Sequence, residues 1–404
     1  MPVRRLPVLE PADAWSTLRR SAVARPLVDA TGPDDEVWVV GGAVRDLLLG
    51  ITPHELDLVV TAPVDGLAQR LAPVVREHER FGTVTVEPSP GVRYDIARAR
   101  RERYAAAGAL PDVVPVDAID ADLERRDVTI NAMALRLHDG AFVAYPGALD
   151  DLASGTLRVL HGQSFRDDPT RVWRVARYAA RLGGRVEPQT AAWAAVADPR
   201  TISGARHGSE LRLALGEPDP AAVLATLQRL NPRFLPEGFE PYPRGVDQAL
   251  ALLPPGGRRD LVRLAVSCAG VSLPILLPWI EALELTVAER TIVGAGSRSS
   301  TLAPLRDART PAEIRRAASG AGDEVVALAG GPNAERWFES IRYVQLEITG
   351  HDLRAAGIEA GPELGRRLQR ALDAKLDGEL DPSVPVREAE LRVALADERP
   401  AGAV

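Results

Sequence analysis

The stretch VWVVGGAVRDLLLGITPHELDLVV, residues 37–60, joins two hydrophobic runs through a glycine pair, a short amphipathic segment and two acidic residues. Four consecutive apolar residues before Gly41 predict a strand. The residues after Gly42 predict a short helix that ends at Gly50. The stretch therefore predicts a strand, a tight turn, a helix and a second strand.

The glycine pair predicts a place where the backbone approaches a ligand closely. The start of the following helix offers free N–H groups to a phosphate. Arg45, in the first turn of that helix, is placed for a bidentate phosphate contact. The alternative is a plain strand-to-helix turn, and this stretch alone does not distinguish the two interpretations.

Glu55 and Asp57 are two residues apart in the second hydrophobic run. In a strand this spacing sends both carboxylates to one face, about 6.6 Å apart along the strand. Oxygen ligands of this kind suit magnesium, which takes one or two carboxylates together with substrate phosphates. The alternative is a solvated strand face. A phosphate-binding turn followed by an acid pair indicates the arrangement required for two-metal nucleotidyl transfer.

The composition predicts a helix-rich protein with an aliphatic core. Hydrophobic residues make up 46% of the 404 residues and charged residues 26%, whereas aromatic residues are only 4%. The net charge of -7 does not indicate nucleic-acid binding, but arginines cluster at residues 98–103 and 166–185, and phosphate affinity depends on such local patches.

Cys268 is the only cysteine, which excludes an intrachain disulfide and a thiolate zinc site. No run of apolar residues has the length of a membrane span, and the N-terminus lacks an apolar signal core. We therefore expect a cytoplasmic protein without a membrane partner.

The pattern changes along the chain from mixed to helical. Residues 1–35 predict an N-terminal arm with a short helix. Strand-like runs at residues 37–40, 56–60, 83–88 and 93–99 predict a mixed head over residues 36–150, in which residues 65–81 predict one helix. Amphipathic segments predict a helical neck over residues 151–240 and a helical body and tail over residues 241–404. Clear helices are predicted at residues 168–183, 220–231, 258–270 and 361–378. The expected fold class is α+β, with a small mixed sheet followed by helices.

The helix predicted at residues 168–183 has two faces. Its arginines fall within about 120° of one another at 100° per residue: these are Arg171, Arg174, Arg177 and Arg181. The opposite side is apolar and consists of Val172, Val175, Ala176, Ala179 and Leu182. Asp168 before Pro169 is a good N-cap, so a purely structural role for Asp168 stays open.

Several motifs, in this order, resemble those of the class II tRNA nucleotidyltransferases and the related bacterial poly(A) polymerases of the polymerase β superfamily. They are GGAVRDLLLG followed by ELDLVV, LERRDVTINAMAL at residues 123–135 and FRDDPTRVWRVARYAARLG at residues 165–183. ISGARHGSEL, residues 202–211, is a weaker match, in which Arg206 and Glu210 are four residues apart. RERYAAAGALPDVVP resembles the flexible loop before the second motif, and residues 348–372 resemble the helical tail. The good match covers residues 36–215.

The resemblance implies a polymerase-β-like head and a set of site residues. Gly41, Gly42 and Arg45 would hold the incoming triphosphate, and Glu55 and Asp57 would bind Mg²⁺, with two ions expected. Asp95 lies where the family often has a third catalytic acid; the alternative is an exposed strand acid.

The second and third motifs imply the nucleotide contacts. Arg126 would contact the nucleotide, while Asp127 and Asn131 would position the ribose; the alternative for the latter two is a helix cap. Asp168 and Arg171 would imitate Watson–Crick partners of the base, and Arg174 and Arg177 would add further contacts.

The chain departs from the family pattern at three places. Glu55 replaces the more usual Asp, which keeps oxygen ligation feasible. Val128 replaces a common Phe, which affects packing more than chemistry. His207 and Gly208 make the fourth motif atypical, so no role is assigned to Arg206 or Glu210.

The resemblance implies a template-independent, Mg²⁺-dependent enzyme that adds CMP, AMP or both from CTP and ATP to the 3′ end of tRNA. The body and tail would bind the tRNA acceptor arm, and no obligate protein partner is expected. The alternatives are an enzyme restricted to the terminal A, or less readily to CC, a poly(A) polymerase, and a non-catalytic RNA-binding relative.

Overall fold

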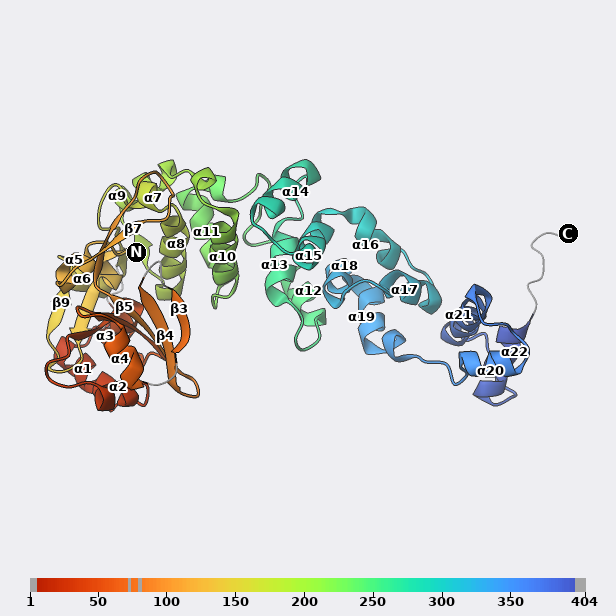
Figure 1. Cartoon of the computed structure of the whole chain (residues 1–404). Helices are drawn as coiled ribbons and strands as arrows, with labels where there is room; N and C mark the ends of the chain where they lie inside the picture. The colour runs from red at the N-terminus through yellow and green to blue at the C-terminus, as the bar shows by residue number, and fades with distance from the viewer. Residues whose placement is uncertain (1–5, 72–73, 79–81, 397–404) are drawn as a thin grey trace. The chain divides into compact units, whose positions relative to one another are not determined.

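The chain forms two compact units, Met1–Leu235 and Pro236–Val404, in a computed structural model that describes residues 6–71, 74–78 and 82–396 (Figure 1). Unit 1 contains a mixed sheet with helices, and the described part of unit 2 is helical. This confirms the predicted α+β fold class. The finer division into arm, head, neck, body and tail stays a prediction.

Unit 1 is built on a seven-stranded sheet with the order β3-β4-β5-β2-β1-β8-β9. Its strands are β1 (Val37–Val40), β2 (Glu55–Val60), β3 (Val74–His78), β4 (Thr83–Ser89), β5 (Val92–Arg98), β8 (Met133–Arg136) and β9 (Phe142–Ala144). Only β2 and β5 pair in parallel, and the other neighbours are antiparallel.

The opening stretch lies in the middle of this sheet. All four residues of β1 are buried, because β1 pairs with β2 on one side and with β8 on the other. On one face of the sheet, Trp38, Val40 and Val59 pack with Leu123 in a hydrophobic cluster. The predicted strands at β1, β2, β4 and β5 are confirmed.

The pairing of β2 with β5 fixes the acid pair. In β2, Glu55 and Asp57 are exposed and Leu56 and Leu58 are buried, as the alternation predicted. The parallel register places Asp57 opposite Asp95. Three acidic positions are thereby brought to one region of the sheet.

The single helix predicted for residues 65–81 is wrong. Helix α4 covers Asp65–Leu71, and β3 follows at Val74–His78. A proline at position 73 cannot continue a helix, and the next residues pair antiparallel with β4. Sheet pairing therefore overrides the apolar helical spacing. Residues 79–81 lie outside the described residues.

The N-terminal segment has two helices where one was predicted, α1 (Pro11–Arg20) and α2 (Arg25–Ala30). Leu18 and Leu27 are fully buried, and the Trp15 indole donates to the Leu137 carbonyl at 3.0 Å. These helices are packed on the sheet domain.

The segment predicted as a flexible loop contains a β-hairpin, with β6 (Arg100–Arg103) antiparallel to β7 (Asp112–Pro115). Its tip is held against helices by Gly108, whose N–H donates to the Arg166 carbonyl at 3.1 Å and whose carbonyl accepts from Arg206 at 3.0 Å. Gly108 has φ 70°, and a Cβ there would lie 2.3 Å from the Thr201 carbonyl oxygen. Only glycine fits this contact.

The rest of unit 1 is mainly helical. Its α-helices are α3 (Gly42–Leu48), α5 (Ile119–Leu123), α6 (Ala148–Ala153), α7 (Ser164–Asp167), α8 (Thr170–Leu182), α9 (Pro188–Val196), α10 (Gly204–Leu215) and α11 (Pro220–Leu230). Short 3-10 helices cover Thr129–Asn131, Pro199–Thr201 and Pro232–Phe234, and β10 (Thr156–Leu157) pairs with β11 (Arg185–Val186). The predicted helices at α8 and α11 are confirmed.

Unit 2 consists of helices, including the two predicted at α13 and α21. They are α12 (Val246–Leu252), α13 (Arg259–Ser267), α14 (Leu273–Ala282), α15 (Val287–Ser297), α16 (Ser299–Arg306), α17 (Pro311–Ala318), α18 (Asp323–Ala329), α19 (Gly331–Glu339), the 3-10 helix Ile341–Tyr343, α20 (Gly350–Ala355), α21 (Pro362–Asp377) and α22 (Val386–Leu395). A large cluster that includes Val262, Ile314 and Val326 forms one core. A smaller cluster around Leu353 and Ala371 forms another.

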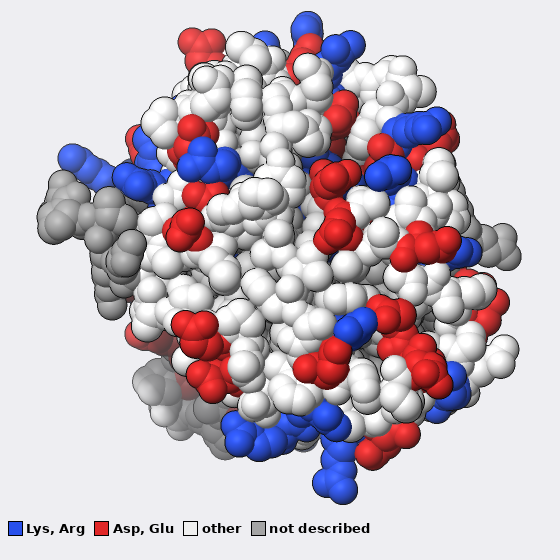
Figure 2. All heavy atoms as spheres, turned by 90° about the vertical axis from the view of Figure 1, so that its left-hand side faces the viewer, with Lys and Arg blue, Asp and Glu red and all other residues white. Residues whose placement is uncertain are grey.

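Among the described residues, no helix combines the length and the apolar character that a membrane crossing requires. On the face drawn in Figure 2, acidic and basic side chains lie interspersed.

Candidate active site

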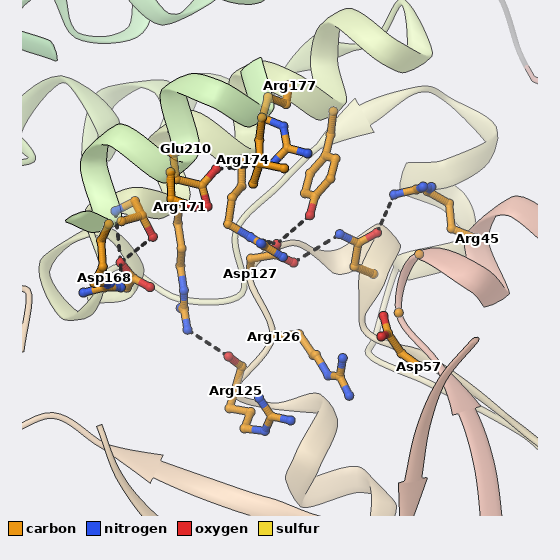
Figure 3. Close-up of a pocket in the computed structure, with 18 of the residues that line it drawn as sticks. Arg45, Asp57, Arg125, Arg126, Asp127, Asp168, Arg171, Arg174, Arg177 and Glu210 are labelled. Carbon is orange, nitrogen blue, oxygen red and sulfur yellow. Dashed lines mark hydrogen bonds and ion pairs between the residues drawn. The ribbon is translucent and has the colours of Figure 1, made fainter. Parts of the chain in front are cut away.

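A cavity of about 580 Å³ in unit 1 brings the predicted motifs together. It is lined by Gly41, Gly42, Arg45, Asp57, Glu102, Tyr104, Arg125, Arg126, Asp127, Asn131, Asp168, Thr170, Arg171, Arg174, Arg177, Tyr178, Arg181, Arg206, Ser209, Glu210 and Leu213. The residues come from the turn after β1, from β2, from the hairpin base, from the loop after α5 and from helices α8 and α10 (Figure 3). The sheet domain and the helices thus share one site.

The glycine turn opens into this cavity. Gly41 has φ 69°, and α3 begins at Gly42. A Cβ on Gly41 would lie 3.4 Å from Arg126 Nη1 and 3.8 Å from Asp57 Oδ2. The bare backbone therefore leaves space between an arginine and a carboxylate, where a ligand group can approach.

Arg45 lies under the cavity and is 2% exposed. Its Nη1 donates to Asn131 Oδ1 at 2.9 Å and its Nε donates to Asp46 at 2.9 Å. The guanidinium also lies 5.5 Å from the Tyr178 ring centroid. Arg45 is thus fixed in place before any ligand binds.

Asp57 lines the cavity, whereas Glu55 is on β2 outside the lining residues. Within the part of the chain that the structure describes, neither carboxylate forms a hydrogen bond or an ion pair. The Asp57 side chain reaches solvent, but the protein atoms around it raise the pKa of its carboxyl group. The negative charges of Asp95 and Glu55 raise this pKa further, whereas the positive charges of Arg126 and Arg174 lower it. Among the described residues, Asp57 and Glu55 thus carry negative charge without a direct ion pair, although Arg126 and Arg174 offset part of the charge on Asp57 from a distance.

Asp95 has chain partners of its own. Thr85 Oγ1 donates to Asp95 Oδ1 at 2.6 Å, and Arg93 Nη2 lies 3.4 Å from the same oxygen. Asp95 does not line the cavity. Across the described ranges, no three His, Cys, Asp or Glu side chains are grouped as a metal site. A metal here would be held by the β2 carboxylates together with ligand oxygens.

The arginine pair of the second motif is held by acids that the sequence analysis did not single out. Asp122 is fully buried, with one oxygen paired to Arg125 at 2.8 Å and the other paired to Arg126 at 2.7 Å. Glu102, on β6, accepts from Arg125 at 3.0 Å and from Tyr104 at 2.8 Å. The hairpin base and the second motif therefore form one polar network.

Asp127 joins the sheet domain to helix α8. Its Oδ2 accepts from Arg174 at 2.6 Å and from the Tyr178 hydroxyl at 3.1 Å. Its Oδ1 accepts from the Val128 N–H at 2.8 Å and from Asn131 Nδ2 at 3.2 Å. Burial opposes the charged form, yet Arg174 and the other donors hold the pKa of Asp127 well below its usual value.

The base-selection candidates lie at the start of α8. Asp168 Oδ1 accepts from the Thr170 N–H at 3.0 Å and from its hydroxyl at 2.6 Å. The N-cap of α8 is Pro169, so the prediction of Asp168 as the N-cap is wrong by one residue. Arg206 of α10 pairs with the same oxygen at 2.7 Å. Arg171 donates to Ser164 Oγ at 2.7 Å and to the Arg125 carbonyl at 2.9 Å (Figure 3).

The other arginines of α8 are also paired. Arg177 binds Glu217 at 3.0 Å and Glu210 at 3.2 Å. Arg181 shares Glu217 at 2.5 Å. The predicted arginine face exists, but three of its four guanidinium groups are paired with buried carboxylates, whereas Arg171 donates to neutral groups.

The structure thus gathers the predicted glycines, arginines, Asp57, Asp127, Asn131 and Asp168 around one cavity, and leaves Glu55 and Asp95 beside it. Sequence reasoning missed Glu102, Tyr104, Asp122, Tyr178 and Glu217. Of these, Asp122 carried a usable signal, since acid and arginine four residues apart face each other on a helix.

Comparison with known proteins agrees with this geometry. Residues 37–158 match the family described as the poly A polymerase head domain. The match covers less than half of the chain, and it contains strands β1, β2, β5 and β8 of the sheet.

Two curated relatives are similar over the first half of the chain. An A-adding tRNA nucleotidyltransferase from Halalkalibacterium halodurans is 38% identical over 208 residues, 48% of this chain and 48% of that protein. A CC-adding tRNA nucleotidyltransferase from Deinococcus radiodurans is 40% identical over 203 residues, 48% of this chain and 54% of that protein. The chain spans about half the length of these curated relatives.

Solved structures are similar over nearly the whole chain. An apo form of a CCA-adding enzyme has a TM-score of 0.73 at 26% identity, and the match covers 92% of this chain and 98% of that one. The Thermotoga maritima CCA-adding enzyme complexed with tRNA has a TM-score of 0.67 at 26% identity, covering 92% and 97%. A CCA-adding enzyme with ATP has a TM-score of 0.70 at 27% identity, covering 92% and 98%.

Proposed function

We propose that the protein is a template-independent nucleotidyltransferase that adds CMP, AMP or both, from CTP and ATP, to the 3′ end of tRNA. One observation carries the proposal: the Gly41 turn and Asp57 share a cavity with Asp168 and Arg171. The first pair suits a triphosphate beside a metal, and the second pair suits the edge of a base. The similarity to A-adding, CC-adding and CCA-adding enzymes supports this assignment.

The sheet side of the cavity would hold the triphosphate. Gly41 and Gly42 leave the backbone accessible, and Arg126 presents a guanidinium beside them. Arg45 is buried under the turn, so we assign it to neutralising phosphate charge and to holding Asn131. These groups fix the α-phosphate for in-line attack by the terminal ribose hydroxyl of the tRNA.

The β2 acids fit Mg²⁺. Their donor set is oxygen only, they repel each other, and Asp57 has no direct ion pair among the described residues. We propose that Asp57 and Glu55 would hold Mg²⁺, with two ions expected, and that Asp95 would support Asp57 from β5. When bound, Mg²⁺ lowers the pKa of the attacking hydroxyl and stabilises charge on the phosphate.

The helical side of the cavity would select the base. Asp168 accepts and Arg171 donates, which matches the mixed edge of C or A better than that of G or U, and a wrong base leaves buried polar groups unpaired. Arg174 and Arg177 are placed to add nucleotide contacts. Since both oxygens of Asp127 already accept two hydrogen bonds each, we assign Asp127 and Asn131 to orienting Arg174 and Arg45 around the ribose.

The helices of unit 2 would bind the tRNA acceptor arm through its shape and its backbone phosphates, as folded RNA is commonly recognised. A tRNA substrate of this kind is cytoplasmic, and we propose the same location for the protein. No obligate protein partner is needed for the reaction.

An extension assay tests the proposal. Purified protein is incubated with Mg²⁺, CTP and ATP and with tRNA transcripts that end at the discriminator base, at C or at CC. Extension of all three to CCA supports the full activity, extension of the CC-ended tRNA alone supports terminal A addition, and arrest at CC supports CC addition. Long A tails would show a poly(A) polymerase. No extension of any transcript would leave a non-catalytic RNA-binding relative and overturn the proposal.

A further inference from the structure

Asp122 is the most completely buried acid beside the cavity. It lies in α5 with 0% exposure, three and four residues before the arginine pair. Its Oδ1 accepts from Arg125 Nε at 2.9 Å, and its Oδ2 accepts from Arg126 Nε at 3.2 Å and Nη2 at 2.7 Å. Each carboxylate oxygen therefore accepts hydrogen bonds from one edge of one guanidinium group, a geometry that fixes the orientation of that group.

Asp122 is also tied to the hairpin. Its Oδ1 accepts from the Arg100 N–H of β6 at 3.2 Å, and Arg125 continues to Glu102 at 3.0 Å. A buried carboxylate is costly unless donors and positive charge surround it. Burial opposes its ionisation, but Arg126 and Arg125 keep the pKa of Asp122 below its usual value. The carboxylate is charged and fully engaged.

This arrangement decides which edge of Arg126 is available. Nε and Nη2 are occupied by Asp122, so Nη1 remains. Nη1 lies 3.4 Å from the point where a Cβ on Gly41 would be, and Asp57 Oδ2 lies 3.8 Å from the same point. Arg126 therefore faces both the phosphate turn and the unpaired carboxylate of Asp57.

We propose that Asp122 is a positioning residue: it holds Arg126 by one edge, so that the other edge faces phosphate at the Gly41 turn and the guanidinium does not close onto Asp57. The inference deepens the proposed function of the same cavity and rests on it. Apart from Asp122, Asp57 is the acid whose charge acts most strongly on Arg126. An ion pair between Arg126 and Asp57 would then remove both the phosphate contact of Arg126 and the metal ligand supplied by Asp57.

The test is equilibrium binding of ATP to the full chain without tRNA, by isothermal titration calorimetry. Asp122→Asn keeps the size of the side chain and removes its charge. We expect ATP to bind about tenfold more weakly, because the charge-assisted contact between Arg126 and phosphate is lost. In extension assays KM for ATP should rise by a similar factor while kcat changes less. Asp120→Asn is the matched control, because Asp120 is exposed in the same helix; it should bind ATP as the wild type does.

A double mutant shows whether Asp122 acts through Arg126. Arg126→Gln should weaken ATP binding as Asp122→Asn does, and Asp122→Asn/Arg126→Gln should be no weaker than Arg126→Gln alone. Additive losses, or Asp122→Asn binding within twofold of the wild type, would overturn the inference. If Asp122→Asn does not fold by circular dichroism, Arg126→Gln decides alone, and wild-type affinity in that variant would overturn the inference.

These outcomes are separable from failure of the proposed function. A wild type that binds ATP but extends no tRNA would refute the tRNA activity and leave the binding comparison intact. A wild type that extends tRNA, combined with an Asp122→Asn variant of unchanged affinity, would refute only the role of Asp122.

Discussion

The cavity has a sheet wall, which includes the Gly41 turn and β2, and a helical wall, which includes α8 and α10, and the two walls differ in how their charged side chains are paired. On the sheet wall, Asp57 has no ion-pair or hydrogen-bond partner among the described residues, and burial together with its acidic neighbours raises its pKa. On the helical wall, Arg174 is paired with Asp127. Arg177 is paired with Glu210 and Glu217, and Arg181 is paired with Glu217. One wall carries uncompensated charge, and the other is neutralised.

The difference indicates which wall is completed by ligands. A guanidinium held by a buried carboxylate is pre-oriented, so little ordering cost arises when a base or ribose arrives. An uncompensated carboxylate cluster costs stability until a cation arrives. The helical wall should therefore matter more for stability and selection, and the sheet wall more for catalysis.

The largest effect should come from Asp57. Asp57→Asn should lower tRNA extension by about 10³-fold, since a metal ligand contributes several kcal/mol to charge stabilisation. An exposed Asp34→Asn variant is the control, and retained activity in Asp57→Asn would remove the metal assignment.

The same variant should separate activity from stability. A raised pKa means that Asp57 favours the fold below its unfolded pKa of about 4 and loses this contribution as the pH rises through its folded pKa. Asp57→Asn should therefore melt at a higher temperature than the wild type at pH 7, with a smaller difference at pH 4. A lower melting temperature at pH 7 would contradict the picture of an uncompensated wall.

On the helical wall, Glu217→Gln should mainly reduce stability. The change removes one buried charge between two arginines, and breaking such a pair costs about 3 kcal/mol of unfolding free energy. Urea denaturation measures this loss, and Glu124→Gln on an exposed site is the control. A loss below about 0.5 kcal/mol would show that the neutralised wall does not stabilise the fold.

Asp168→Asn should change selection more than rate. Replacing the carboxylate acceptor by an amide should lower the preference for CTP or ATP over GTP and UTP by about tenfold. The preference is measured as the ratio of kcat/KM values for the four nucleotides. Asp219→Asn is the matched control, because Asp219 accepts from the Ala222 N–H at the start of α11 at 3.0 Å, as Asp168 accepts from the Thr170 N–H at the start of α8. Equal losses of kcat/KM for all four nucleotides would show that Asp168 has only a structural role.

The smallest effect concerns the hairpin tip, which contacts Arg206 of the helical wall. Gly108→Ala and Gly91→Ala both place alanine at positive φ, at a cost of about 1 kcal/mol each. Only at position 108 does the new Cβ meet backbone, whereas position 91 has open space. Limited proteolysis within residues 104–111 should be several-fold faster in Gly108→Ala, and equal rates would show that the tip contact does not hold the hairpin.

Local patterns in the sequence predicted much of this architecture. Strands β1, β2, β4 and β5 and helix α8 follow directly from apolar periodicity. Strand β3 was missed because its residues continue a helical spacing, and only pairing with β4 reveals it. The hairpin β6–β7 was missed for a similar reason, since arginine-rich strands lack an apolar alternation.

The site was predicted by residue type but not by pairing. The motifs located the arginines and acids, yet no local signal connects Arg177 with Glu217, which is 40 residues away in sequence. The sequence therefore predicted the arginine face but not the carboxylates that pair with most of it. Likewise, both Asp127 and Asn131 are engaged by the chain, a fact that only the fold establishes.

The parallel register of β2 and β5 has a consequence for how this site tolerates sequence change. Backbone hydrogen bonds, rather than side-chain packing, bring Asp57 opposite Asp95. Glu55 is the first residue of β2 and is exposed, so an added methylene meets no packed neighbour. Natural variation at position 55 can therefore lengthen the carboxylate without disturbing the strand that carries Asp57, whereas a one-residue insertion in β5 would turn Asp95 to the opposite face of the sheet.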